Sequence, residues 1–366
     1  MHILSMKNIA IIAILLSLSF LCAAQSPAGP VSEKTPITLK IGGMSIIRYN
    51  YSANADPSGM LSLRNVRLNA GGRIVDDFEY RLQVTLEGTT NSINGPHMLD
   101  AYVEWQKYKA FRVKIGQFKR AFTFENPINP IDQGFYNHGM AVSKLAGMKD
   151  RAGEHSCSGR DLGLQVQGDL FELDGHSLLH YMLGIYNGQG INVADLNNSK
   201  DVIGGLWLSP LEGMRIGAFG WSGKYGRVYQ GNYAEVDRRR FAISAEYKPD
   251  EWIFRTEYVF SKGMAFKNPY GGNLDLDTEL GDRADAWYAL MMAPLVPGTL
   301  RAKLRYDVYR DNGDWGRAYS AYDFGLDYQV TNHLIFSAIG SYVNDRRLAA
   351  GHHNYFMFDF QLGLRF

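Results

Sequence analysis

The stretch Asn354–Phe366 reads NYFMFDFQLGLRF and alternates between two kinds of side chain along its whole length. One parity is entirely apolar and consists of Phe356, Phe358, Phe360, Leu362, Leu364 and Phe366. The other is mostly polar and consists of Tyr355, Met357, Asp359, Gln361, Gly363 and Arg365. Successive side chains of a β-strand point to opposite faces of the sheet. The stretch therefore predicts a strand with one apolar face and one largely polar face.

The same two-residue period recurs along the chain from about residue 37 onward. It is clearest in residues 80–87, 111–116, 162–167, 300–308 and 322–330. After residue 24, no stretch is long and apolar enough to predict a membrane-spanning helix, which needs about 20 residues. Because a soluble β-sandwich would show the same alternation, the pattern alone leaves two classes of all-β protein open.

The connectors between these segments favour one of the two classes. Short connectors are expected at 75–78, 108–110, 171–176, 210–213, 248–251, 295–298 and 331–333. Longer polar connectors are expected between them, near 50–60, 89–97, 119–160, 187–199, 223–235, 263–281, 311–317 and 345–353. Tight turns at one rim and long loops at the other are typical of an outer-membrane barrel. We therefore predict that residues 36–366 form an all-β transmembrane antiparallel β-barrel of about 16 strands, with short periplasmic turns and long extracellular loops.

The N-terminus has the pattern of a secretory signal peptide. Residues 1–24 carry Lys7, then an apolar run from Ile9 to Leu21, then small residues before Gln25. Residues 25–35 would be a short linker. These features predict export and a location in the bacterial outer membrane, where lipid surrounds the barrel. The mature chain would keep a single cysteine, Cys157, and so no internal disulfide.

Composition excludes several functional classes. Lys and Arg together number 38 and Asp and Glu 37, so the chain lacks the basic excess of a nucleic-acid-binding protein. No nucleophile elbow, zinc-binding helix or phosphate-binding loop occurs in the sequence. We therefore expect no enzymatic activity, no metal and no cofactor.

The strand parity also predicts which charged side chains face the lumen. About sixteen strands enclose more space than side chains fill, so a water-filled pore is expected. The basic residues expected to line the ion pathway are Arg112, Lys114, Lys119, Arg120, Arg238, Arg240, Arg301, Lys303 and Arg305. Rings of Arg and Lys favour anions. The alternative is that these residues pair with acidic ones and brace the wall, and the acidic segments 98–107 and 318–330 could face them across the lumen.

Three blocks of sequence resemble the phosphate-selective porin O and P family of outer-membrane channels. They are residues 116–119 (GQFK) with Glu125 downstream, residues 160–168 (RDLGLQVQG), and residues 181–190 (YMLGIYNGQG). The resemblance implies a sixteen-stranded barrel, commonly a homotrimer, whose third loop folds inward and whose basic residues guide anions. On this resemblance, Lys119 and Arg120 at the start of loop 119–160 would have the anion-guiding role.

These observations predict an outer-membrane porin that lets small hydrophilic solutes diffuse passively. A mild preference for anions such as phosphate is the finer prediction. Ala121 and Phe122, which follow Lys119 and Arg120, lack the hydroxyl groups that could hold a phosphate. The alternative function is that of an outer-membrane receptor or adhesin, in which the barrel is a scaffold for surface loops.

Overall fold

A computed structural model describes residues 37–86, 96–154, 158–268 and 271–366. The predicted signal peptide and linker lie outside these ranges, as does Cys157. The described chain is almost entirely β-structure, with one short helix, α2 (Met140–Leu145), and one 3₁₀ turn, η1 (Trp315–Arg317). The strands are β1 (Lys40–Ser52), β2 (Gly59–Val75), β3 (Phe78–Thr85), β4 (His97–Tyr108), β5 (Phe111–Lys119), β6 (Arg160–Leu173), β7 (His176–Tyr186), β8 (Asp201–Leu208), β9 (Met214–Tyr229), β10 (Asn232–Tyr247), β11 (Ile253–Lys262), β12 (Arg283–Val296), β13 (Leu300–Arg310), β14 (Ala318–Thr331), β15 (Leu334–Asp345) and β16 (Asn354–Arg365).

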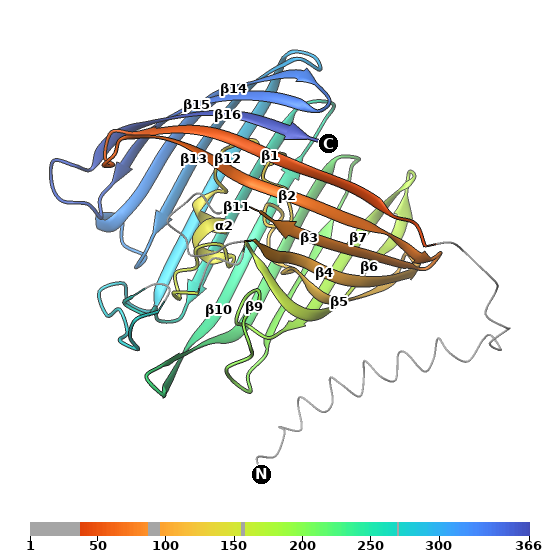
Figure 1. The fold of residues 1–366 in the computed structure, drawn as a ribbon, viewed down its shortest axis with the longest axis horizontal. Helices are drawn as coiled ribbons and strands as arrows, with labels where there is room; N and C mark the ends of the chain where they lie inside the picture. Colours follow the sequence, from red (N-terminus) through yellow and green to blue (C-terminus); the bar gives the residue numbers. More distant parts are fainter. Residues whose placement is uncertain (1–36, 87–95, 155–157, 269–270) are drawn as a thin grey trace. The chain divides into compact units, whose positions relative to one another are not determined.

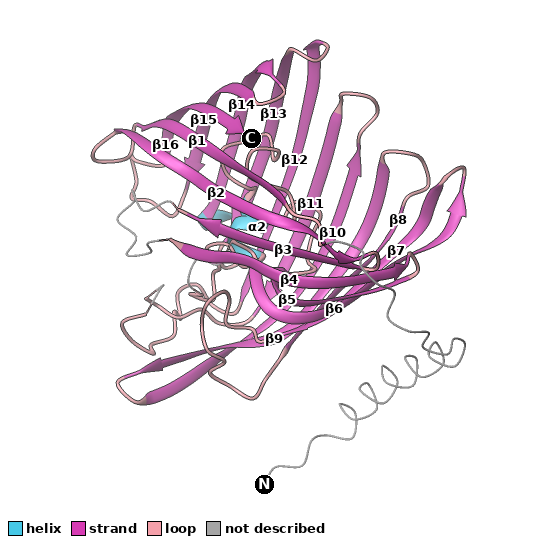
Figure 2. Cartoon of the chain, turned by 45° about the vertical axis from the view of Figure 1, so that its right-hand side comes forward, coloured by secondary structure: helices cyan, strands magenta, loops and turns pink. Residues whose placement is uncertain are grey.

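The strands form one closed antiparallel barrel in chain order (Figures 1 and 2). Each strand pairs with its neighbours along the chain, and β16 pairs with β1 to complete the ring. At this seam the backbones of Gly43 and Phe366 exchange two hydrogen bonds, of 2.8 and 3.1 Å. Closure removes the unpaired edges that an open sheet would present. The predicted fold class and the strand number are both confirmed.

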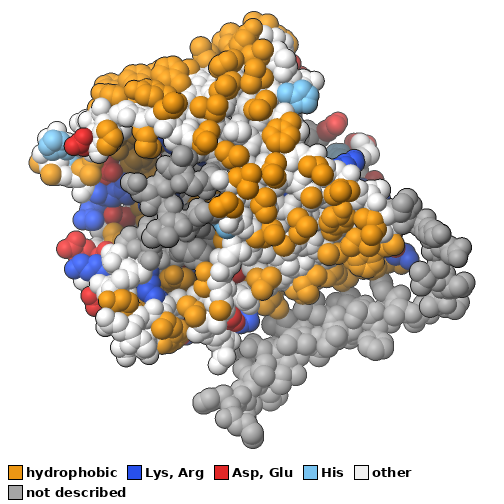
Figure 3. All heavy atoms as spheres, in the orientation of Figure 1, with side chains coloured by type: hydrophobic (Ala, Val, Ile, Leu, Met, Phe, Trp, Pro, Cys, Tyr) orange, Lys and Arg blue, Asp and Glu red, His pale blue; other side chains and the backbone are white. Residues whose placement is uncertain are grey.

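The alternation of side chains sorts apolar groups to the outside. Phe356, Phe358 and Phe360 on β16 are 52%, 41% and 54% exposed, whereas the intervening Asp359 is 2% exposed. Figure 3 shows hydrophobic side chains spread over the outer face that it displays. Lipid offers no hydrogen-bond partners to the backbone, so a closed sheet with an apolar exterior suits a bilayer. No helix in the described part of the chain is long and apolar enough to cross a membrane.

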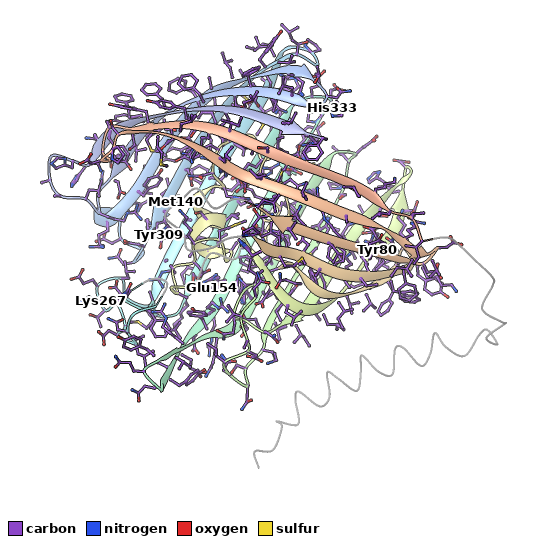
Figure 4. All side chains as sticks on the ribbon, in the orientation of Figure 1. Tyr80, Met140, Glu154, Lys267, Tyr309 and His333 are labelled. Carbon is purple, nitrogen blue, oxygen red and sulfur yellow. The ribbon has the colours of Figure 1, made fainter. Side chains whose placement is uncertain are left out.

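Short turns and longer loops lie at opposite ends of the barrel, which we call the turn end and the loop end. His333, between β14 and β15, lies at the turn end, and Lys267, between β11 and β12, lies at the loop end (Figure 4). All seven predicted short connectors are found.

One predicted loop is wrong. The long loop expected near 223–235 does not exist, because β9 and β10 continue through it and join at Gln230 and Gly231. Both residues have positive φ, 50° and 80°, which suits the two-residue turn of a twisted hairpin. The polar residues that suggested a loop pair across the hairpin instead, as Lys224 does with Glu235.

Candidate functional site

The loop between β5 and β6, called here the β5–β6 loop, crosses the interior of the barrel. Its helix α2 packs against β11, β12 and β13. In the order of the ring, β13 is eight strands from β5 by either route, so the loop reaches the opposite wall. Figures 1 and 2 both show α2 inside the ring of strands, and Figure 4 places Met140 and Glu154 there. The loop therefore folds inward, as the family resemblance implied.

The neck of the loop is closed by its own backbone and by Lys119. The Arg120 amide donates to the carbonyl of Gly159, 2.9 Å away, so the two ends of the loop meet. The ammonium group of Lys119 donates to the carbonyl oxygens of Asn126 and Ile128, the latter at 3.1 Å. These contacts turn the chain inward directly after β5.

A buried network of charges fixes the loop to β10 and, through Arg238, to β8. Arg120 contacts the carboxylates of Glu154 and Asp161 at 2.5 and 2.8 Å. Arg238 on β10 contacts the other oxygen of Glu154 at 2.8 Å and Asp201 on β8 at 2.7 Å. All five side chains are at most 1% exposed. Moving a charged side chain out of water costs free energy, and here each buried charge has an opposite partner that compensates this cost. The compensation would be lost if the loop moved away from Arg238.

A second buried pair joins the loop to β10. Arg240 donates to Asp150 through two nitrogens, at 2.6 and 2.7 Å, and to the carbonyl of Leu145 at 2.9 Å. Burial would raise the pKa of Asp150, but the positive charges of Arg240 and Arg238 outweigh it and lower the pKa from 3.8 to about 2. Asp150 is thus ionised at neutral pH and holds its arginine.

Side chains of β11 and β13 hold the loop mainly by accepting hydrogen bonds from the loop's backbone amides. Glu257 on β11 accepts the amides of Phe124 and Glu125, at 2.5 and 3.0 Å. Asp307 on β13 accepts the amide of Met140 at 2.9 Å. These bonds satisfy backbone donors that the loop could not pair by itself.

Two predicted pathway residues contact the loop from the same wall. Arg305 donates to the carbonyl of Asn137 at 2.8 Å, and Lys303 donates to the carbonyl of Gly134. Glu125 also lies on this loop. Burial raises the pKa of its carboxyl group above the usual value, although the positive charges of Arg255 and Arg305 act to lower it.

All nine predicted pathway residues have hydrogen-bond or ion-pair partners, and they fall into two groups. Arg120, Arg238, Arg240, Lys303 and Arg305 are buried and contact the β5–β6 loop or belong to it. Arg112, Lys114, Lys119 and Arg301 are less buried. Three of these four also form ion pairs, Arg112 with Asp169, Lys114 with Glu104 and Arg301 with Asp327.

The acidic segment 318–330 does not face its basic partners across the lumen, as one alternative proposed. Asp323 and Asp327 on β14 pair with Arg305 and Lys303 on the adjacent β13. The partners are neighbours because short lateral distances between strands allow direct ion pairs, whereas the lumen separates opposite walls.

A hollow of about 240 Å³ remains beside the loop on the β3–β7 side of the lumen. Its charged lining is strongly basic, with five cations and the single carboxylate of Asp100: Arg81, Lys114, Lys119, Arg120 and Arg160. The side chains of Arg81 and Lys114 are 35% and 16% exposed, so water reaches both. Arg81 and Lys114 are therefore the cations of this hollow that a dissolved anion could approach.

The alternation of side chains along β2 did not predict that Arg64 faces the lumen. Asn65 has a positive φ of 57°, and the pairing of β2 with β1 shifts there. As a result Arg64 lies opposite Ile46 and Arg67 opposite Met44, and both partners are buried inside the barrel. An extra residue in one strand changes which residues face inward after it. Only the asparagine itself, which tolerates this backbone conformation, was a signal in the sequence.

The neighbourhood of His138 also shows how basic this region is. His138 lies in the β5–β6 loop, and burial lowers its pKa well below the usual value. The charges of Lys119, Arg64, Arg67 and Arg305 lower it further. Burial and the neighbouring positive charges both favour the neutral imidazole of His138.

Residues 45–152 match the model of the family described as phosphate-selective porin O and P. The match runs from β1 into the β5–β6 loop and covers just under a third of the chain. It confirms the resemblance to this family and includes the block at residues 116–119, whereas the blocks at 160–168 and 181–190 lie outside the match. No curated protein matches the chain.

Solved structures of outer-membrane channels share the fold over nearly the whole chain. The anion-selective porin of Comamonas acidovorans is 12% identical, with a TM-score of 0.63, and the match covers 90% of this chain and 99% of that one. The channel DcaP of Acinetobacter baumannii is 13% identical, with a TM-score of 0.58 and coverages of 91% and 99%. The trimer form of OmpT of Vibrio cholerae is 12% identical, with a TM-score of 0.57 and coverages of 90% and 99%. At such identities the likeness establishes a shared fold.

Proposed function

We propose that this relative of the phosphate-selective porins O and P is an outer-membrane porin through which small hydrophilic solutes diffuse passively. The observation that supports this most directly is the β5–β6 loop, which crosses the lumen and is held by buried charged side chains of β10, β11 and β13. A loop held in this way would narrow the pore, and the hollow beside it would be part of the remaining passage. Residues 119–160 would then be the constriction.

The proposal extends to a mild preference for anions, including phosphate. Rings of basic side chains lower the free energy of an anion in a narrow pore. Arg112, Lys114 and Arg301 would contact passing solutes because they are less buried than the other predicted residues. Lys119, at the start of the loop, would guide anions mainly by holding the neck of the loop in place. The remaining five, Arg120, Arg238, Arg240, Lys303 and Arg305, would act by holding the loop and by adding to the field. The excess of cations around the hollow supports the sign of this preference.

The proposal also covers assembly and export. The apolar exterior suits a barrel embedded in the lipid of the outer membrane, reached after cleavage of residues 1–24 as a signal peptide. A homotrimer is the proposed assembly, supported by the trimer form of the OmpT structure of the same fold. We propose no catalytic role for the chain.

The test is the current through single refolded barrels in a planar bilayer, with a KCl gradient across it. Steady conductance with a reversal potential on the anion side would support both the porin and its preference. Conductance with a reversal potential near zero would keep the porin and contradict the anion preference. A folded barrel that passes no current would contradict the proposal and favour a receptor or adhesin.

A further inference from the structure

Three basic side chains lie next to one another on the outside of the barrel. Arg239 on β10 is directly opposite Lys262 on β11, which is directly opposite Arg283 on β12. All three are exposed, and Arg239 alternates with the buried Arg238 and Arg240, so it points away from the lumen. These three residues, called here the basic row, lie level with the loop-end termini of β11 and β12, while β10 continues for seven more residues toward its hairpin with β9.

Carboxylates of the protein neutralise the basic row only in part. Arg239 lies 3.7 Å from Asp237 and Arg283 lies 4.0 Å from Asp282, and both pairs are at least half exposed. Exposed pairs at such distances contribute little. No ion pair joins Lys262 to a carboxylate of the described residues. Like charges directly opposite each other destabilise a sheet, so the row would be more stable with an anion bound between its members.

Aromatic side chains lie on the outer face near the row. On β12 the residue opposite Phe260 is Asp285, which forms an ion pair with Arg310 of β13. The aromatic residues are Phe241 and Phe260, which pair two residues further along β10 and β11, and Trp287, two residues beyond Asp285. These three aromatic side chains are 46%, 37% and 40% exposed and face the same side as the row. A ligand that satisfies both surfaces must carry negative charge at one end and apolar chains at the other.

We propose that the basic row binds the phosphate-bearing head group of a lipid in the outer leaflet, with the acyl chains lying on Phe241, Phe260 and Trp287. The inference rests on the proposed outer-membrane location, which places the loop end in that leaflet. A lipid is favoured over free phosphate because the row faces away from the pore and adjoins an apolar surface. Clustered Lys and Arg beside a membrane attract anionic lipid head groups.

The experiment is native mass spectrometry of the detergent-refolded, full-length mature chain titrated with lipid A, a diphosphorylated disaccharide lipid. The wild-type protein should bind saturably. The triple variant R239Q/K262Q/R283Q should bind at least tenfold more weakly. The control variant K40Q/K107Q/K109Q removes the same charge from exposed residues at the turn end and should bind within twofold of wild type. Heat-dependent mobility on a gel shows that each variant is folded.

Three results would overturn the lipid site: equal binding by the triple variant, equal binding of dephosphorylated lipid A, or full displacement of lipid A by equimolar inorganic phosphate. The last result would identify a site for free phosphate. All three proteins are also tested for conductance in planar bilayers. A wild-type barrel that conducts but fails to bind lipid A would reject the basic row and leave the porin proposal standing, so the two failures are distinguishable.

Discussion

Glu154 of the β5–β6 loop and Arg238 of β10 form an ion pair of 2.8 Å in which neither side chain is more than 1% exposed. The residues are 84 positions apart in the chain. Since Glu154 also binds Arg120, one carboxylate joins the beginning of the loop to the barrel wall.

Replacing Glu154 with Gln should loosen the loop and raise the conductance. The substitution leaves Arg120 and Arg238 buried with less compensating charge, and breaking a buried ion pair costs about 3–5 kcal/mol. Single-channel recording should show a larger and noisier current than in wild type. Glu172→Gln is the matched control, because Glu172 pairs with Lys109 at an exposed site. Identical currents in wild type and the Glu154 variant would show that the network does not hold the loop.

Acid should weaken the attachment of the loop through Asp150. The pKa of this carboxyl is lowered to about 2 in the folded protein, against 3.8 for the group without its partners. A lowered folded pKa gives stability that is present above the unfolded pKa and is lost as the pH falls through the folded one. The free energy of unfolding should therefore decline between about pH 4 and pH 2.

The measurement is urea unfolding at several pH values, followed by the fluorescence of the six tryptophans, of which Trp221 packs 4.5 Å from the guanidinium of Arg240. Asp150→Asn should be less stable at neutral pH and should lose much of the decline below pH 4. Asp237→Asn, which removes an exposed carboxylate, should leave the decline intact. An Asp150 variant with the full wild-type decline would assign the acid sensitivity to other groups.

The turn between β9 and β10 should tolerate Asn but not Val at position 231. Gly231 has a φ of 80°, and no atom lies within 4 Å of the place where a Cβ would be. The effect of a side chain there is therefore one of backbone conformation, which costs a β-branched residue about 1–2 kcal/mol. Gly231→Val should lower the denaturant midpoint, while Gly231→Asn should lie close to wild type. Equal midpoints for the two variants would contradict the left-handed turn.

Neutralising Arg81 and Lys114 should reduce the anion preference. Both line the basic hollow and are reached by water, so their charge acts directly on a solute in the pore. In the double variant R81Q/K114Q the reversal potential in a KCl gradient should move toward zero. The control K107Q/K109Q removes two charges outside this hollow and should change the potential less. An unchanged potential in the double variant would place selectivity elsewhere.

The barrel could be predicted well from the sequence because the side chains on its outer face are almost all apolar. Every lipid-facing position must be apolar, so alternation in segments such as 322–330 revealed the strands and their inward parity. The same rule placed Arg238 and Arg240 inside the wall and omitted Arg239. The rule failed in two places. At Asn65 an extra residue in β2 changes which side chains face inward. In β9 and β10, polar residues such as Lys224 continue the strands beyond the apolar segment, so a loop was predicted there.

The partners of the charged residues could not be predicted in the same way. Glu154, Asp150 and Asp161 are ordinary acidic residues in a long connector or at a strand end, and nothing local distinguishes them. Their roles arise only when the loop folds across the lumen and meets β8 and β10. The sequence could therefore identify the cations of the pore but not which of them hold the loop and which remain near water.

The seam between β1 and β16 has a consequence for how the protein is assembled. Gly43 and Phe366 meet across more than 300 residues of intervening chain, so the last contact of the ring is also the most distant along the sequence, and such contacts form slowly. Until it forms, β1 and β16 both present unpaired backbone edges that can pair with any other exposed strand. A chain that has formed fifteen of its sixteen strand pairings thus still has two unpaired edges at which it can aggregate. Productive assembly requires that β1 and β16 be kept from pairing with other strands until they pair with each other.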